Sequence, residues 1–138
     1  MATSYRWIRK ATVERVIDGD TVVLTFDLGF GVLLTGQHVR LVGSAKGLPR
    51  YFDAPEARGP LATPAGQEAT AALRRLLPQG LAVTVETFKG QASDLYGRWL
   101  AAIWPMESLG FVVIGEDGPL AGQDCASVLV AGGLGLFR

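Results

Sequence analysis

A tight-turn motif, Asp18-Gly19-Asp20, separates two segments rich in β-branched residues near the start of the chain. This pattern predicts two antiparallel strands, over residues 7–17 and 21–26, joined by a short turn. A third strand is expected over residues 32–42. Because side chains alternate along a strand, Arg40 in this third segment points away from the apolar residues on either side of it. The chain is therefore expected to be built mainly on β-structure.

The segments that follow predict one long helix, two further strands and a second helix. Residues 44–64 contain four prolines and little periodicity, so they are expected to form loops. Thr63 and Pro64 are a suitable N-cap and first helical residue, and apolar residues then recur at helical spacing up to Pro78. The remaining elements are expected at residues 81–88 (strand), 95–104 (strand), 111–114 (an additional short strand) and 125–132 (helix). This order predicts a mainly β fold with helices: a five-stranded Greek-key barrel of the OB type, with one helix between strands 3 and 4 and a second near the C-terminus.

The composition fits a single folded domain over residues 1–138. Hydrophobic residues make up 49% of the chain and charged residues 19%, which is too apolar for a disordered protein. Thirteen basic and thirteen acidic side chains cancel, so any nucleic-acid activity must come from local arginines rather than from an overall positive field. The single cysteine, Cys125, excludes an internal disulfide framework and a thiolate-rich metal site, and it is expected to fill the core.

Two features bear on location. The longest stretch without a formal charge, Cys125 to Phe137, has 13 residues, whereas a membrane-crossing helix needs about 20. No membrane partner is therefore expected. Residues 1–10 lack the apolar core of a secretory signal, so a secreted or periplasmic location would require a leader that has been removed, and the sequence predicts no compartment.

Three carboxylates lie where they can project from the mouth of such a barrel. Asp20 follows the first turn, and Asp53 and Glu56 flank Ala54-Pro55, where the proline keeps Ala54 extended and the two carboxylates splayed. Carboxylates together with main-chain carbonyls are the ligands that hard divalent cations prefer. The same residue types are also common turn formers and solvated loop residues, and the pattern alone leaves both interpretations open.

Two arginines narrow the choice. Arg40 and Arg98 are embedded among apolar residues, where an unpaired guanidinium would cost several kcal/mol. Each therefore requires an anion. Pairing with Asp20 or Glu56 would satisfy them, and so would a phosphodiester held by two arginines beside a carboxylate-bound cation, an arrangement that stabilises the transition state of phosphodiester cleavage.

Taken in order, several short motifs resemble the signatures of staphylococcal nuclease-like domains. The similarity extends from about residue 11 to residue 135, and the motifs are Ile17-Asp18-Gly19-Asp20-Thr21-Val22, Val39-Arg40-Leu41, Asp53-Ala54-Pro55-Glu56, Gly66 to Ala69, and Asp94-Leu95-Tyr96-Gly97-Arg98-Trp99-Leu100-Ala101. The resemblance implies an OB-fold, calcium-dependent cleavage of DNA and RNA phosphodiesters, and products with 3′-phosphate and 5′-hydroxyl ends.

By the same resemblance, each motif residue acquires a role. Asp20 and Asp53 would bind Ca²⁺ through their carboxylates and Ala54 through its main-chain carbonyl. Glu56 would accept a proton from the attacking water or position that water. Arg40 and Arg98 would hold the phosphate, with one of them also near the departing 5′ oxygen.

The sequence departs from the family pattern in the 13 positions that separate Arg40 from Asp53. Residues 44–52 are interpreted as a loop insertion that leaves the chain at Phe52, which would restore a strand just before Asp53. The insertion contains Lys46, Arg50 and Tyr51, cations beside an aromatic ring, and these are predicted to contact single-stranded substrate; a plain solvent loop is the alternative. The tyrosines that line the family's nucleotide pocket near its end have no counterpart before Arg138.

Three functions remain open at this stage. The leading prediction is a monomeric, metal-dependent endonuclease acting on DNA and RNA, preferentially single-stranded or denatured. The second is a catalytically weak or inactive OB-fold module that binds nucleic acid or a protein. The third is a structural domain in which arginines and acids pair with one another.

Overall fold

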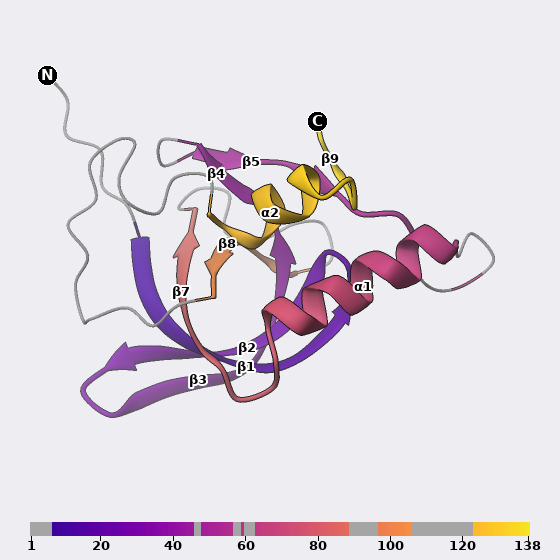
Figure 1. Cartoon of the computed structure of the whole chain (residues 1–138). Helices are drawn as coiled ribbons and strands as arrows, with labels where there is room; N and C mark the ends of the chain where they lie inside the picture. The colour runs from indigo at the N-terminus through magenta and orange to yellow at the C-terminus, as the bar shows by residue number, and fades with distance from the viewer. Residues whose placement is uncertain (1–6, 46–47, 57–58, 60–62, 89–96, 106–122) are drawn as a thin grey trace, which may run out of the picture.

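The computed structural model describes residues 7–45, 48–56, 59, 63–88, 97–105 and 123–138 (Figure 1). Five strands form a closed barrel in the order β1-β2-β3-β8-β7. Their bounds are β1 Trp7–Asp18, β2 Thr21–Gly29, β3 Val32–Leu41, β7 Ala82–Thr87 and β8 Trp99–Trp104. Neighbouring strands are antiparallel except β3 and β8, which are parallel. The prediction of a mainly β, OB-fold-like barrel of five strands with helices is confirmed.

The barrel encloses a core of aliphatic side chains that alternate inward along its strands. On β3, Val39 and Leu41 are fully buried while Arg40 between them faces the other way, as predicted. The inward residues of the other strands include Val13, Val22, Leu24, Val83, Val85 and Ile103. A smaller cluster on the outer side of β8 contains Val42, Phe88, Leu100, Ala102 and Trp104.

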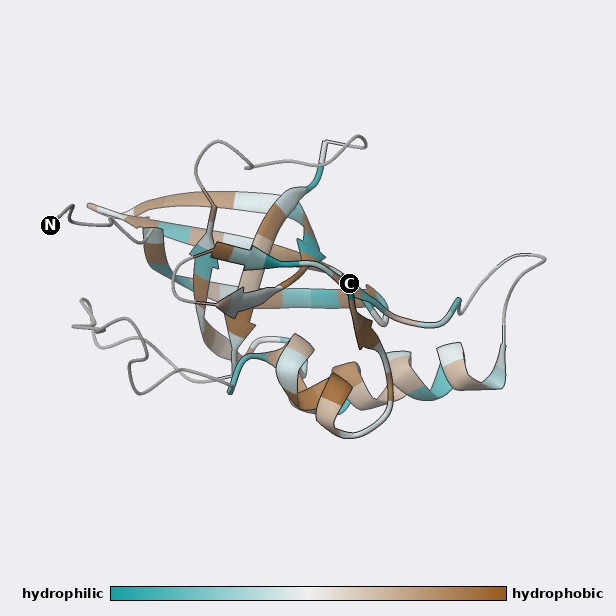
Figure 2. Ribbon diagram, turned by 90° about the horizontal axis from the view of Figure 1, so that it is seen from above, coloured by the Kyte–Doolittle hydropathy of each residue, from teal (hydrophilic) through white to brown (hydrophobic). Residues whose placement is uncertain are grey.

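Helix α1 (Pro64–Leu76) lies alongside the barrel and contacts β1 (Figures 1 and 2). The Oγ1 atom of Thr63 accepts a hydrogen bond from the backbone N–H of Gly66 at 3.0 Å, so the predicted N-cap is confirmed. Pro64 opens the helix, where the lack of an N–H costs nothing. The buried face, centred on Ala69 and Leu73, joins the barrel core.

Helix α2 (Cys125–Ala131) ends at Gly132, as the sequence predicts, and Asp124 caps its start. Cys125 is completely buried in the main core, which confirms its structural role. After a turn at Gly133 with φ of 75°, the chain forms the short strand β9 (Leu136–Phe137). No local sequence pattern predicts this last strand.

The prediction that residues 44–64 form only loops is wrong in its first half. Strands β4 (Gly43–Ala45) and β5 (Leu48–Arg50) form an antiparallel hairpin, and β6 (Phe52–Asp53) pairs with β9. Most of the described residues in the segment interpreted as an insertion, residues 44–52, are therefore paired in β-ladders. Phe52 does restore a strand before Asp53, but its partner is the distant β9. The predicted strand at 111–114 and the first residues of the strand predicted at 95–104 lie outside the described residues.

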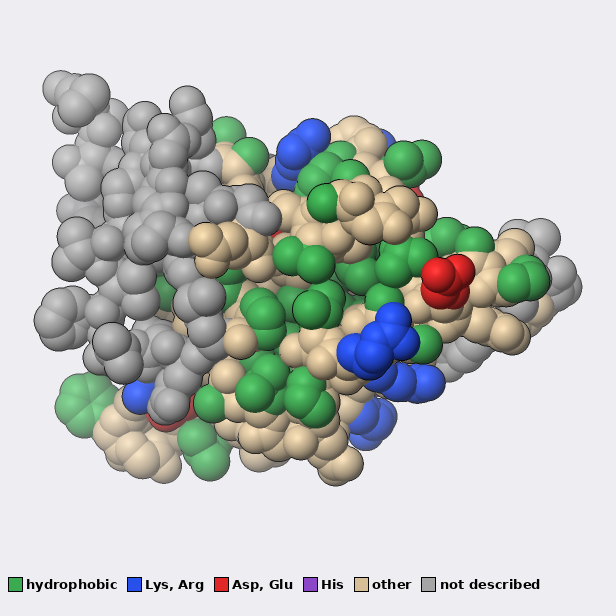
Figure 3. All heavy atoms as spheres, in the orientation of Figure 1, with side chains coloured by type: hydrophobic (Ala, Val, Ile, Leu, Met, Phe, Trp, Pro, Cys, Tyr) green, Lys and Arg blue, Asp and Glu red, His purple; other side chains and the backbone are tan. Residues whose placement is uncertain are grey.

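Figure 1 shows β4, β5, α2 and β9 gathered on the same side of the barrel. On the face seen in Figure 3, most described side chains are uncharged, with a small basic group and an acidic side chain next to α1. Among the described helices, none has the length and apolar character needed to cross a membrane.

Candidate functional site

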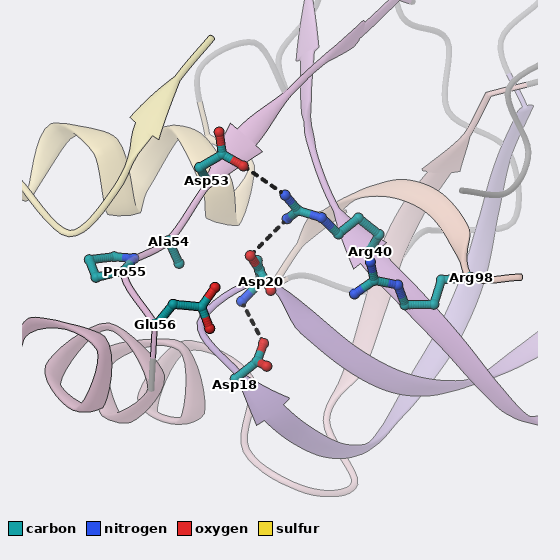
Figure 4. Close-up of a pocket in the computed structure, with 8 residues that line it drawn as sticks. All are labelled: Asp18, Asp20, Arg40, Asp53, Ala54, Pro55, Glu56 and Arg98. Atoms are coloured by element: carbon teal, nitrogen blue, oxygen red, sulfur yellow. Dashed lines mark hydrogen bonds and ion pairs between the residues drawn. The ribbon is translucent and has the colours of Figure 1, made fainter. Parts of the chain in front are cut away.

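A pocket of about 430 Å³ lies where the β1–β2 turn, β3, the segment after β6 and the start of β8 meet (Figure 4). Its lining residues are Asp18, Asp20, Arg40, Asp53, Ala54, Pro55, Glu56 and Arg98. All six residues predicted as catalytic or metal-binding are in this set. Segments up to 80 positions apart in the sequence thus meet at one hollow, as the positions of Asp18 and Arg98 show.

The turn before Asp20 is packed tightly against the segment that follows β6. A Cβ atom added at Gly19 would lie 2.8 Å from the Cβ of Ala54 and 3.2 Å from the Cβ of Ala69. Gly19 therefore serves close approach as well as turn formation. The backbone N–H of Asp20 donates a hydrogen bond to Oδ1 of Asp18 at 3.2 Å, which holds the turn closed. Asp18, interpreted from the sequence only as a turn former, is in fact a fourth carboxylate of the pocket.

Asp20 is the most electrostatically perturbed group of the pocket. Burial raises the pKa of its carboxyl, the neighbouring Asp18 carboxyl raises it further, and Arg40 offsets part of the effect, which leaves the pKa at about 6. Its Oδ1 atom accepts a hydrogen bond from the Thr21 hydroxyl at 3.2 Å. The raised pKa therefore reflects mainly the burial of this carboxyl, which Arg40 only partly offsets.

Arg40 bridges two of the predicted cation ligands. Its Nη1 atom lies 3.0 Å from Oδ2 of Asp20, and its Nη2 atom lies 3.1 Å from Oδ1 of Asp53. The same Nη2 also donates to the carbonyl of Phe52 at 2.6 Å. The guanidinium, 12% exposed, is therefore paired with protein acceptors, as the structural alternative for this arginine requires.

Asp53 is held from both sides by arginines. While Oδ1 faces Arg40, Oδ2 lies 2.9 Å from Nε of Arg138 on the far side of the carboxylate. Arg138 follows β9 and had no functional signal in the sequence, because its proximity to Asp53 depends on a strand pairing between residues more than 80 positions apart.

Arg98 and Glu56 complete the pocket. Nη1 of Arg98 donates to the Thr21 hydroxyl at 3.0 Å, so Arg98 is linked through Thr21 to Asp20. Glu56 directs its exposed carboxylate toward Asp20 (Figure 4). Its own carbonyl accepts a hydrogen bond from the backbone N–H of Thr63 at 2.8 Å, which ties this segment to the start of α1.

The residues predicted to contact substrate lie outside the pocket lining. Arg50 places its guanidinium 3.9 Å from the ring centroid of Phe137, and Arg138 lies 5.5 Å from the ring centroid of Tyr51. Both Arg50 and Tyr51 are exposed, next to the strand that carries Asp53. Lys46 lies outside the described residues.

The donor chemistry of the pocket fits a hard divalent cation. Four carboxylates and two guanidiniums line it, and Ala54 belongs to the same lining. Within the described part of the chain, however, no three His, Cys, Asp or Glu side chains stand close enough together to hold a metal ion as they are arranged. The guanidinium of Arg40, between Asp20 and Asp53, bridges the two aspartates that the resemblance assigns to the ion.

Comparisons of the chain with models of protein families and with curated proteins gave no match. The interpretation of the pocket therefore rests on its own residues.

Proposed function

We propose that this protein is a calcium-dependent nuclease that hydrolyses phosphodiester bonds of DNA and RNA, leaving 3′-phosphate and 5′-hydroxyl ends. The observation that carries the proposal is the convergence of three carboxylates, Asp20, Asp53 and Glu56, and two guanidiniums, Arg40 and Arg98, on a single pocket. A volume of about 430 Å³ accommodates a cation and a phosphate group together. A purely structural role would not require Arg98 and Glu56 to face the same hollow.

The cation site of this proposal consists of the carboxylates of Asp20 and Asp53 and the carbonyl of Ala54. Because acids outnumber arginines in the lining by four to two, a divalent cation would neutralise the excess negative charge. When bound, calcium would polarise a phosphoryl oxygen and stabilise the charge that develops on it. The raised pKa of Asp20 agrees with this assignment, since burial disfavours its charged form and a bound cation would stabilise that form.

The remaining groups act on water and phosphate. Glu56 accepts a proton from the attacking water, or orients that water, while the water oxygen forms a bond to phosphorus. The bond from phosphorus to the 5′ oxygen breaks, and this oxygen takes up a proton to become a hydroxyl. Arg40 and Arg98 donate hydrogen bonds to the phosphate oxygens, and one of them also reaches the departing oxygen. Arg40 therefore exchanges at least one carboxylate partner for the phosphate when substrate binds.

The proposal is tested by incubating denatured DNA with the protein in calcium or in chelator and measuring the release of short fragments. Glu56→Gln is expected to lower the rate about 10²- to 10⁴-fold. Arg98→Ala is expected to lower it about 10²- to 10³-fold, by the loss of charge stabilisation. Glu68→Gln and Arg74→Ala, which alter exposed residues of α1, are matched controls that keep the wild-type rate.

Absence of calcium-dependent cleavage by the wild-type protein would contradict the proposal. A second function, a non-catalytic module that binds nucleic acid, is favoured by one observation: Arg50 and Tyr51, a cation beside an aromatic ring, are exposed outside the pocket lining. Retention of single-stranded DNA without cleavage, in calcium and in chelator alike, would support that function instead. Weaker retention by Arg50→Ala or Tyr51→Ala would support the predicted substrate contacts under either function.

A further inference from the structure

Strand β9 holds the segment that carries Asp53. Phe52 pairs with Phe137 and Asp53 with Leu136 in an antiparallel ladder. The backbone N–H of Arg138 donates to the carbonyl of Tyr51 at 3.0 Å and extends this ladder by one bond. Among the described strands, β9 is therefore the one that fixes the backbone of β6.

Side-chain packing makes this attachment specific. The rings of Phe52 and Phe137 meet edge to face, with centroids 6.2 Å apart. A Cβ atom added at Gly135 would lie 2.6 Å from Cζ of Phe52 and 3.0 Å from the carbonyl oxygen of Asp53, so only glycine permits this approach. Phe137 in turn covers Gly43, where an added Cβ would lie 2.8 Å from the ring. The segment after α2 is thus fitted to the strand that contains Asp53.

The carboxylate of Asp53 is oriented by two different arginines. Its Oδ1 faces the pocket and lies 3.1 Å from Nη2 of Arg40, and its Oδ2 lies 2.9 Å from Nε of Arg138. The Asp53 side chain is 51% exposed, so neighbouring packing alone does not fix its rotamer. Arg138 remains outside the pocket lining and acts on the oxygen that points away from it.

We propose that Arg138 is a positioning residue: by holding Oδ2 of Asp53, it keeps Oδ1 directed into the pocket and thereby sets the affinity of the pocket for a divalent cation. This inference rests on the proposed function, in which Asp53 is a cation ligand. Strand β3 carries Arg40 but ends at Leu41, so it does not extend to Asp53, 13 positions after Arg40. The pairing of β6 with β9, together with Arg138, places Asp53 instead. Groups that orient ligating carboxylates commonly alter metal affinity 10- to 100-fold when they are removed.

Removing Arg138 has two opposite effects on the affinity for a cation, so the direction of the measured change shows which effect is larger. Loss of a positive charge near the pocket would strengthen cation binding, whereas loss of orientation would weaken it. Because Arg138 is 65% exposed, solvent and salt screen its charge, and the orientation effect is expected to dominate. Arg74→Ala, which removes an exposed positive charge from α1 outside the pocket lining, is the matched control.

The test measures binding of calcium alone, by competition with a fluorescent calcium chelator, to wild type, Arg138→Ala, Arg138→Lys and Arg74→Ala at constant ionic strength. Arg138→Ala is expected to bind calcium about tenfold more weakly. Arg138→Lys should recover part of this loss, because it retains one donor for Oδ2. Arg74→Ala should bind as wild type does. Thermal unfolding in chelator checks that each variant is folded, since a merely structural role would lower the midpoint without a specific loss of affinity.

Different results would contradict the positioning role of Arg138 and the cation site itself. Calcium binding by the wild type that Arg138→Ala leaves unchanged, or makes tighter, overturns the positioning role and leaves the proposed cation site intact. A wild-type protein that binds no calcium overturns the proposed cation site and the positioning role with it.

Discussion

Arg40 connects the carboxylates of the pocket to one another. Its side chain is only 12% exposed on a barrel strand, so its guanidinium requires acceptors within the protein. The structure provides the carboxylates of Asp20 and Asp53 and the carbonyl of Phe52. Asp20 was among the partners expected from the sequence, whereas pairing with Asp53 could not be predicted, because the approach of Asp53 depends on β6 and its pairing with β9.

Asp20 leads to a prediction about pH and stability in the absence of calcium. Its folded pKa of about 6 lies above the ordinary value of 3.8, so between these values the folded protein binds more protons than the unfolded chain. Stability of the metal-free protein should therefore fall as the pH rises from about 4 to about 7, because ionising Asp20 in the fold is unfavourable. The Asp20→Asn variant lacks this titration.

The measurement is urea unfolding of wild type and Asp20→Asn in chelator at several pH values. Asp20→Asn also loses the ion pair to Arg40, which changes its free energy of unfolding. The quantity to compare is therefore how the difference in unfolding free energy between the two proteins changes with pH. Relative to wild type, the free energy of unfolding of Asp20→Asn should rise by ~1–3 kcal/mol between pH 4 and pH 7. A difference that stays constant over this range would show that the Asp20 carboxyl titrates normally.

At the level of elements, α2 depends on its cap. Asp124 is fully buried, its Oδ2 accepts from the backbone N–H of Ser127 at 3.1 Å, and its Oδ1 accepts from the Ser127 hydroxyl at 2.8 Å. Asp124→Ala should lower the free energy of unfolding by about 1–2 kcal/mol, because the helix loses its N-cap. Burial raises the pKa of Asp124, so Asp124→Asn, which can still cap without a buried charge, should lose clearly less in urea unfolding at pH 7. Equal losses for both variants would contradict the capping role.

The elements that could be predicted are those with long local signals. Strands of six residues or more and α1, with its Thr63-Pro64 start, follow from periodicity and capping residues. Strands β4, β5, β6 and β9 have two or three residues each, too few to show a period. They exist because distant segments pair, as Phe52 does with Phe137, and this pairing has no local trace in the sequence.

For the whole molecule, the site was more predictable than the segments that support it. The residue patterns together with the family resemblance identified six of the eight pocket residues, because these residues lie in short motifs that can be read locally in the sequence. The structural support of Asp53 by β9 and Arg138 could not be found in the same way, since it depends on how the chain after α2 returns to the pocket.

The whole fold is expected to open as one unit, and Cys125 provides a direct test. This single cysteine is completely buried where α2 meets the barrel core, and burial raises the pKa of its thiol to about 12. Because thiol reagents attack the thiolate, the native protein should react many times more slowly than the urea-unfolded chain. With increasing urea, the reaction should accelerate in parallel with the loss of circular dichroism, since α2 shares its core with α1 and the strands. Rapid labelling at urea concentrations that leave the circular dichroism unchanged would show instead that α2 opens independently of the barrel.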